Sequence, residues 1–160
     1  MSKTATVADS MEILQLVSFT IGREEFGVDI LKVQEINRMF QITKVPNSPE
    51  YVDGVINLRG RVIPVIDLRC KLGLARKEHD KDTRIIVVDL SGRTMGFIVD
   101  KVKEVLRIPG SIIEPPPDLA AGMNAEYITA VGKLEDRLLI LLDLEKIITN
   151  QEKMQLSSLN

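Results

Sequence analysis

The sequence predicts an all-β protein built from two similar halves, each of which forms a small antiparallel barrel or sandwich. Two observations support this prediction: an internal repeat, and a series of short β-branched segments separated by turn residues at close spacing. The 160 residues are 44% apolar and 28% charged, with a net charge of −2, which is typical of a soluble globular protein. A chain of this length buries roughly 68–70% of its unfolded surface, so it needs no disulfide or metal ion for stability.

The repeat consists of two pairs of matching segments in the same order. Glu50–Leu68 and Glu126–Leu144 are identical at seven of 19 positions in register. Phe26–Ile36 and Met95–Val105 share a glycine, a lysine, a valine and a glutamate. The second copy is seven residues longer, and the excess falls in the proline-rich stretch Glu114–Tyr127, which has the composition of a loop. An internal duplication accounts for both matches.

The charged, turn-like stretch Ala75–Thr83 separates the two copies. We therefore expect a single domain over residues 12–150, with a first barrel at about 12–79 and a second at about 80–150. The polar ends of the chain, residues 1–11 and 151–160, are expected to be flexible tails.

The first half contains five segments with strand patterns. Alternating or β-branched residues predict a strand in each of the first three segments. The last two segments are expected to form a hairpin with an Arg-Gly turn. The segments are Ile13–Ile21, Glu24–Ile30, Val33–Phe40, Gly54–Leu58 and Arg61–Leu68.

The second half repeats this order of elements. Its last hairpin is expected to close with Glu135 and Asp136 in place of Arg-Gly. The segments are Arg84–Leu90, Thr94–Val99, Val102–Ile108, Ile128–Leu134 and Arg137–Leu144.

Short helices are expected to close both halves. Asp67 precedes the helix-forming stretch Leu68–Leu72, which Gly73 ends, and Asp143 precedes Leu144–Ile148. An aspartate in this position caps the free N–H groups of a first helical turn, and glycine often follows the last turn. N-capping therefore explains the two aspartates better than a catalytic carboxylate pair does.

Residues suited to catalysis or metal binding are few. The single histidine, His79, lies in the charged connector, and the single cysteine, Cys70, lies in a predicted apolar helix. A Cys–His catalytic pair is the alternative to a buried thiol and an exposed imidazole, and these contexts favour the second interpretation. The sequence has no CxxC or HxxxH spacing and no glycine-rich phosphate loop. We therefore expect no enzymatic activity, no metal and no cofactor.

Composition also limits the classes of partner that the protein is expected to bind. A small barrel that binds oligonucleotides needs a basic groove with stacking aromatic residues, whereas this chain has 4% aromatic residues and no excess of positive charge. Its longest aliphatic run, Leu138–Leu142, is too short to span a membrane. The first residues contain no apolar stretch before a cleavage site, so we expect no secretion, and a single cysteine is compatible with a reducing cytoplasm.

The repeat provides an internal control for candidate contact residues. Glu35 corresponds to Glu104 and Arg61 to Arg137, which suggests structural roles in both copies. Arg59 is different because its counterpart is Glu135. The turn therefore does not require an arginine, and a partner contact is as reasonable for Arg59 as simple solvation.

The residues Glu24–Ile36, Ile42–Arg69 and Glu126–Ile148 resemble the CheW family of chemotaxis coupling proteins. The resemblance extends over about Leu14–Ile148, and its most specific part is the block GVINLRG followed by PVIDLR. The same module occurs inside chemotaxis histidine kinases. We expect a free-standing coupling protein here, because the length leaves no room for a kinase or receiver domain.

The resemblance implies a pair of five-stranded SH3-like barrels with short capping helices. It also implies a non-catalytic signalling adaptor that couples transmembrane chemoreceptors to a chemotaxis histidine kinase and supports receptor control of kinase activity in arrays. The expected partners are the cytoplasmic hairpin tips of receptors and the regulatory domain of the kinase. The adaptor would be cytoplasmic, recruited to membrane receptor arrays, mostly monomeric alone, and without nucleic acid or direct membrane insertion. A related pathway with another output, such as pilus or surface motility, remains the alternative.

The family's contact residues carry over by motif position. The receptor-binding residues would be Ile30, Val33, Glu35, Asn57, Leu58 and Arg59. The kinase-binding residues would be Thr43 and Gly54.

Overall fold

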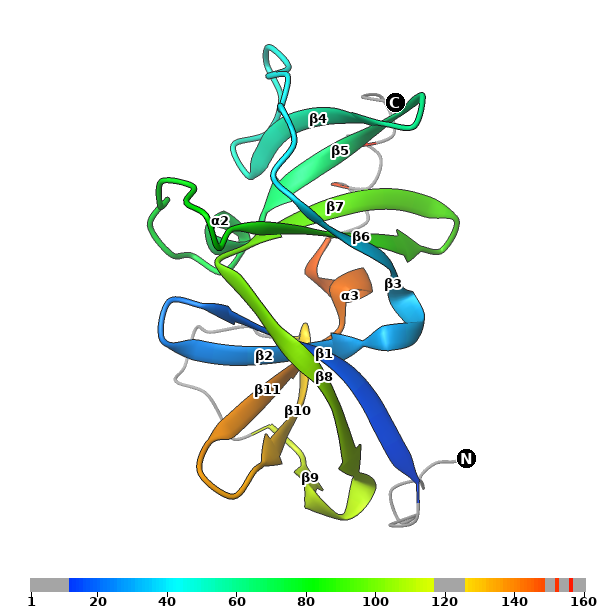
Figure 1. The fold of residues 1–160 in the computed structure, drawn as a ribbon, viewed down its shortest axis with the longest axis vertical. Helices are drawn as coiled ribbons and strands as arrows, with labels where there is room; N and C mark the ends of the chain where they lie inside the picture. The colour runs from blue at the N-terminus through cyan, green and yellow to red at the C-terminus, as the bar shows by residue number, and fades with distance from the viewer. Residues whose placement is uncertain (1–11, 117–125, 149–151, 153–155, 157–160) are drawn as a thin grey trace. The chain divides into compact units, whose positions relative to one another are not determined.

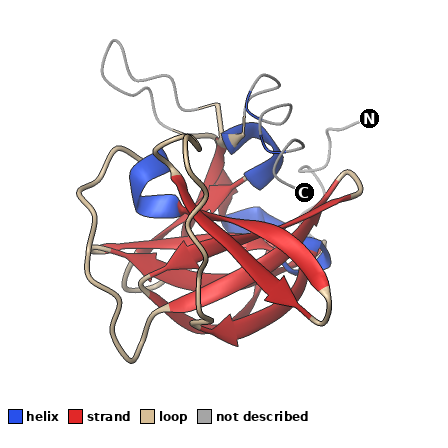
Figure 2. Cartoon of the chain, turned by 90° about the horizontal axis from the view of Figure 1, so that it is seen from above, coloured by secondary structure: helices blue, strands red, loops and turns tan. Residues whose placement is uncertain are grey.

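The computed structural model describes residues 12–116, 126–148, 152 and 156. Strands form most of this part of the chain, and the helices are short (Figure 2). The strands are β1 (Ile13–Ile21), β2 (Glu24–Asp29), β3 (Val33–Arg38), β4 (Val52–Leu58), β5 (Arg61–Asp67), β6 (Arg84–Leu90), β7 (Arg93–Val99), β8 (Lys101–Pro109), β9 (Ile113–Glu114), β10 (Ile128–Lys133) and β11 (Leu138–Leu142). The predicted all-β fold is confirmed, and the ten predicted strands occur in the predicted order, whereas β9 was not predicted.

The short helical elements include two α-helices that follow the predicted aspartates Asp67 and Asp143. The elements are the 3₁₀ turns η1 (Ile30–Lys32) and η2 (Gly110–Ile112) and the helices α2 (Leu68–Lys71) and α3 (Leu144–Ile147). The side chain of Asp67 accepts a hydrogen bond from the backbone N–H of Arg69 at 3.0 Å, and Asp143 accepts from that of Glu145 at 3.0 Å. Both aspartates are therefore helix caps, as the sequence indicated.

The strands form two sheets. One has the order β8-β1-β2-β11-β10-β9 and the other has the order β3-β6-β7-β5-β4. The elements β1 to β5 and α2 of the first half recur in the second half as β6, β7, β8, β10, β11 and α3. Each sheet therefore combines the first hairpin of one half with the third strand and the last hairpin of the other. The parallel pairs β2–β11 and β5–β7 occupy corresponding places in the two sheets.

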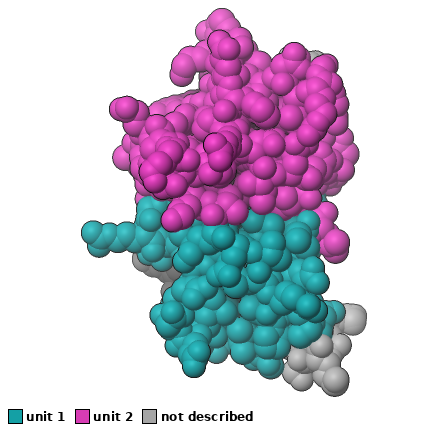
Figure 3. All heavy atoms as spheres, viewed as in Figure 1, with its two compact units in different colours: residues 1–30, 103–147 teal, residues 31–102, 148–160 magenta. Residues whose placement is uncertain are grey.

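This exchange changes the division of the chain that the sequence predicted. One compact unit consists of Met1–Ile30 and Lys103–Ile147, and the other of Leu31–Val102 and Ile148–Asn160 (Figures 1 and 3). The expected contiguous barrels at 12–79 and 80–150 are therefore replaced by units that each draw on both halves. The physical reason is that duplicated halves carry the same strand pattern, so sequence alone does not choose between the two possible partners of a hairpin.

Each unit has its own apolar core. The core of the first unit contains Leu16, Ile108, Ala130, Leu139 and Leu141, with the partly buried Leu106 against it. The core of the second unit contains Ile56, Leu58, Ile63, Val65, Ile85, Val87 and Ile98, with Met39 and Ile42 against it. Full burial of one such side chain contributes about 1.5–3 kcal/mol, so these clusters supply the main driving force for each sheet.

Two residues near the C-terminus differ from the expected flexible tail. Leu156 is buried, and the two carboxylate oxygens of Glu152 accept hydrogen bonds from Lys71 Nζ at 2.7 and 2.8 Å. The remaining residues of the expected tails and most of the proline-rich insertion lie outside the described residues. Among the residues that the structure describes, no helix is long and apolar enough to cross a membrane.

Candidate functional site

The predicted receptor-binding residues of the second unit gather at β3 and at the turn between β4 and β5. Glu35 lies on β3, one edge of the five-stranded sheet, and Arg59 lies in the turn that follows the other edge strand, β4. Arg59 Nη1 donates to Glu35 Oε2 at 2.6 Å, and Nη2 donates to Oε1 at 2.9 Å. This bidentate pair joins the two edges of the sheet. Bidentate arginine–carboxylate pairs of this kind are stronger than neutral hydrogen bonds, because both groups are charged and two N–H groups donate in parallel.

The turn that carries Arg59 has a left-handed backbone. Arg59 has a φ of 53° and Gly60 a φ of 86°, as in a type I′ hairpin turn. The side chain of Asn57 accepts a hydrogen bond from the Gly60 N–H at 2.9 Å and fixes this conformation. Asn57 therefore shapes the turn from an exposed position.

The β6–β7 turn supplies a direct comparison. Ser91 and Gly92 have φ values of 54° and 85°, and Asp89 accepts from the Gly92 N–H at 3.0 Å. This is the same turn with a serine in place of Arg59. The backbone thus does not need an arginine at this position, which leaves its side chain available for another role.

The comparison with Glu135 that the sequence suggested does not hold in detail. The β10–β11 turn also has two central residues, because the Leu134 N–H donates to the Arg137 carbonyl at 2.9 Å. Neither Glu135 nor Asp136 has a positive φ, however, so the two turns differ in backbone conformation. The tolerance of the Arg59 position therefore rests on Ser91 and not on Glu135.

The ion pair lowers the pKa of Glu35. The Arg59 guanidinium, and after it the Asn37 amide, lowers the pKa of the Glu35 carboxyl group from 4.5 to about 2. The side chain of Arg59 is 72% exposed and that of Glu35 is 24% exposed, so water and salt screen the pair. The pair therefore contributes more to the shape of the charged surface than to stability.

This pKa gives a direct prediction. Because the pKa of Glu35 is lowered on folding, the pair contributes to stability above pH 4.5, and this contribution is lost as the pH falls through about 2. In a carboxyl-detected NMR titration, Glu35 should titrate near pH 2 in the natural chain and closer to pH 4.5 in Arg59→Ala. An unchanged midpoint in the variant would show that the pair does not form in solution.

The other predicted receptor residues have different environments. Leu58 is 7% exposed and belongs to the core cluster, so it supports the turn from beneath and does not face a partner. Ile30 and Val33 are half-buried at η1 and at the start of β3. Ile30 belongs to the first unit and the others to the second.

Exposed aliphatic residues on the same elements were missed by the sequence analysis. Leu31 in η1 is 87% exposed, Val62 on β5 is 49% exposed, and Ile36 on β3 is 39% exposed. Val62 lies opposite Asn57 in the β4–β5 register. The apolar run in this strand gives no sign of exposure, but Arg61 and Val62 at its start are exposed and the five residues that follow are buried. Exposed aliphatic side chains beside charged groups are typical of a protein-contact surface.

The predicted kinase-binding residues Thr43 and Gly54 lie together at the edge of β4. The backbone groups of Thr43 and Val55 exchange two hydrogen bonds of 2.9 Å. Gly54 has a φ of 152°, and a Cβ there would lie 2.4 Å from the Thr43 carbonyl oxygen. Gly54 is buried and Thr43 is exposed. Gly54 is thus required for the close approach of the two segments, and Thr43 is the one that faces solvent.

The duplicated arginines have corresponding structural roles. Arg61 Nη2 donates to Thr94 Oγ1 at 3.0 Å, and Arg137 Nε donates to Glu25 Oε1 at 2.6 Å. Glu25 is buried and also accepts a hydrogen bond from the Ser18 hydroxyl. Burial raises the pKa of Glu25, but the hydrogen bonds from Ser18 and Arg137 outweigh it and give a net lowering. These contacts hold the final hairpin of each sheet, as the repeat suggested for Arg61 and Arg137.

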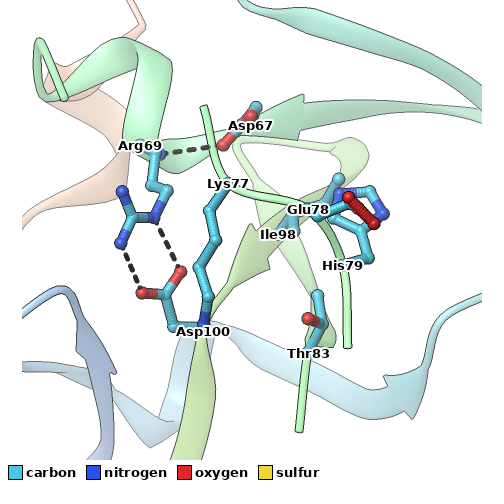
Figure 4. Close-up of a pocket in the computed structure, with 8 residues that line it drawn as sticks. All are labelled: Asp67, Arg69, Lys77, Glu78, His79, Thr83, Ile98 and Asp100. Carbon is cyan, nitrogen blue, oxygen red and sulfur yellow. Dashed lines mark hydrogen bonds and ion pairs between the residues drawn. The ribbon is translucent and has the colours of Figure 1, made fainter. Parts of the chain in front are cut away.

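A small cavity lies beside the charged stretch Ala75–Thr83 and is lined mostly by polar residues (Figure 4). Its volume of about 10 Å³ is sufficient for about one water molecule, which is too small for a substrate. Arg69 closes one side through a bidentate pair with Asp100 at 2.9 Å, and His79 lies on another side. Cys70 does not line the cavity, and burial raises the pKa of its thiol, which disfavours the reactive thiolate.

Comparison with known proteins identifies the family. A family model described as the CheW-like domain matches residues 15–152. The chemotaxis protein CheW of Klebsiella aerogenes is 42% identical over 138 residues, covering 86% of this chain and 83% of that protein. CheW of Helicobacter pylori is 42% identical over 141 residues, covering 88% and 84%. The scaffolding protein TtCheW from Thermoanaerobacter tengcongensis matches with a TM-score of 0.80 and 36% identity, covering 88% of this chain and 96% of that one. The chain therefore belongs to the CheW family.

Proposed function

We propose that this protein is a non-catalytic signalling adaptor, which couples transmembrane chemoreceptors to a chemotaxis histidine kinase in membrane-associated arrays. The observation that carries the proposal is the exposed Arg59–Glu35 pair. Arg59 lies on a turn whose backbone does not need an arginine, and it pairs with Glu35. The chain belongs to the CheW family. Charged groups of this kind set the register and choice of a partner more than its raw affinity.

The receptor-facing surface would consist of Ile30, Val33, Glu35, Asn57 and Arg59, with Leu58 beneath it. The cytoplasmic tip of a chemoreceptor is an amphipathic helical hairpin, and its apolar ridge would pack on aliphatic side chains while its polar groups meet the ion pair. The exposed Leu31 and Val62 extend the aliphatic part of the surface.

The kinase-facing surface would include Thr43, held in place by Gly54. The partner would be the regulatory domain of the histidine kinase, and the adaptor would work in the cytoplasm at receptor arrays. Signalling needs reversible contacts, so modest interfaces repeated across an array suit this function better than one obligate interface.

Sedimentation tests the kinase contact. The isolated protein should be mostly monomeric and should form a heavier species with the kinase regulatory domain, with a Kd on the order of micromolar, typical of a transient interface. A stable high-order oligomer of the protein alone, or no complex with the regulatory domain of the same organism's kinase, would contradict the proposal.

A further inference from the structure

A second polar side chain holds the Glu35 carboxylate. Asn37 lies two residues further along β3, on the same face of the strand because side chains alternate. Its Nδ2 donates to Glu35 Oε1 at 2.9 Å, and this oxygen also accepts from Arg59. Asn37 therefore supplies a hydrogen bond that does not depend on Arg59.

The duplicated half shows what the fold otherwise places at this position. The counterpart of Asn37 is Leu106, which packs against the apolar core of the first unit. Asn37 pairs with Ile85 across the sheet, and Ile85 belongs to the core of the second unit. Directly paired residues share a face, so a leucine at position 37 would add to that core. The sequence thus has an amide where the fold favours an aliphatic side chain.

The carboxylates of Glu35 and Glu104 also differ in their contacts. Glu35 has hydrogen bonds of 2.6 and 2.9 Å from Arg59, together with the bond from Asn37. Its counterpart Glu104 has Leu106 in place of the amide and a contact of 3.5 Å with Arg137. Arg137 corresponds to Arg61 and is held by Glu25. The second half therefore lacks both the amide and an arginine in the place of Arg59.

We propose that Asn37 is a positioning residue for partner recognition, which orients the Glu35 carboxylate so that Glu35 and Arg59 meet the partner as one preorganised pair. This inference rests on the proposed adaptor function. Arg59 is exposed and Glu35 is half-buried. Two such long side chains lose rotamer freedom on binding, and a group that fixes them beforehand reduces this cost. Asn37 acts through Glu35 and need not touch the partner.

This role predicts that stability and binding change in opposite directions. In Asn37→Leu the new side chain should extend the core as Leu106 does, so Tm should stay the same or rise. The affinity for a chemoreceptor cytoplasmic hairpin fragment should fall about 5- to 10-fold, because Glu35 and Arg59 must then be ordered during binding. The isosteric Asn37→Asp, which replaces the donor by an acceptor beside Glu35, should weaken binding at least as much.

The test uses the full chain with three readouts: thermal unfolding, affinity for the receptor fragment, and NMR titration of Glu35. Both Asn37 variants should remain folded, bind more weakly, and raise the pKa of Glu35 above about 2. The matched control Leu106→Asn should lower Tm through lost apolar burial and leave binding by the folded protein unchanged.

Unchanged affinity in a folded Asn37 variant would overturn the inference, as would an unchanged Glu35 titration. If Asn37→Leu fails to fold, Asn37→Asp decides the matter. If the natural chain itself does not bind the receptor fragment, the proposed function fails, whereas the Glu35 titration still decides whether Asn37 orients the carboxylate.

Discussion

Gly54→Ala is expected to destabilise the protein by about 2–5 kcal/mol, from backbone strain together with overpacking. Gly54 has a φ of 152°, and an added Cβ would lie 2.4 Å from the Thr43 carbonyl oxygen and 2.6 Å from Ile42 Cγ2. The carbonyl accepts one of the two hydrogen bonds that link Thr43 and Val55, so moving it away from a Cβ disturbs this backbone bridge. Urea unfolding followed by circular dichroism measures the loss.

Gly60→Ala is the matched control for this prediction. Gly60 also has a positive φ, 86°, but an added Cβ would meet nothing within 4 Å. Only the backbone preference is lost, at about 1–2 kcal/mol. Equal losses in the two variants would show that crowding against Thr43 is not the cause. The comparison also guides the interpretation of kinase binding. If Gly54→Ala is partly unfolded, its weak binding to the kinase reflects the loss of folded protein and not the loss of a direct contact.

Arg59→Glu is expected to abolish coupling while the protein stays folded. The side chain is exposed, and a serine occupies the same position in the β6–β7 turn, so Tm should fall by no more than about 4 °C. The substitution places a second carboxylate next to Glu35 and reverses the charge that meets the partner. Loss of a charge-assisted contact that is buried in the complex lowers affinity by about 30-fold or more.

Two variants separate the parts of this effect. Arg59→Ser removes the charge without reversing it, in the turn geometry that Ser91 already adopts, and should weaken receptor binding less than Arg59→Glu does. Glu135→Arg changes charge at the corresponding turn of the other unit and should leave coupling almost unchanged. Full coupling by Arg59→Glu would reduce Arg59 to a solvated turn residue, and a lost unfolding transition would make it structural.

Local elements followed from the sequence because their causes are local. The alternation in Ile13–Ile21 and the β-branched run Arg84–Leu90 predicted β1 and β6 with the observed bounds. Asp67 and Asp143 predicted α2 and α3 because a cap acts within one helical turn.

The pairing of these elements did not follow, because duplicated strands are interchangeable in pattern. The sequence assigned β2 to the same barrel as β5, whereas β2 pairs with β11 and β5 with β7. Only the three-dimensional packing of the two halves selects between these arrangements.

The candidate site was predicted only in part from the sequence. The mismatch between Arg59 and Glu135 identified Arg59 as unusual, and its pairing with Glu35 required the fold, because the two residues lie on opposite edges of a sheet. Asn37 was missed although its counterpart is the apolar Leu106. The substitution of an amide for an aliphatic residue between repeats was a signal in the sequence.

Receptor-dependent kinase activity tests the central claim most directly. The histidine kinase and receptor cytoplasmic fragments of the same organism are assayed for autophosphorylation without this protein, with it, and with Arg59→Glu. The adaptor function predicts strong stimulation by the natural chain, near-basal activity with Arg59→Glu, and full stimulation with Glu135→Arg. Kinase activity that does not respond to the natural chain, or that responds equally to Arg59→Glu, would contradict it.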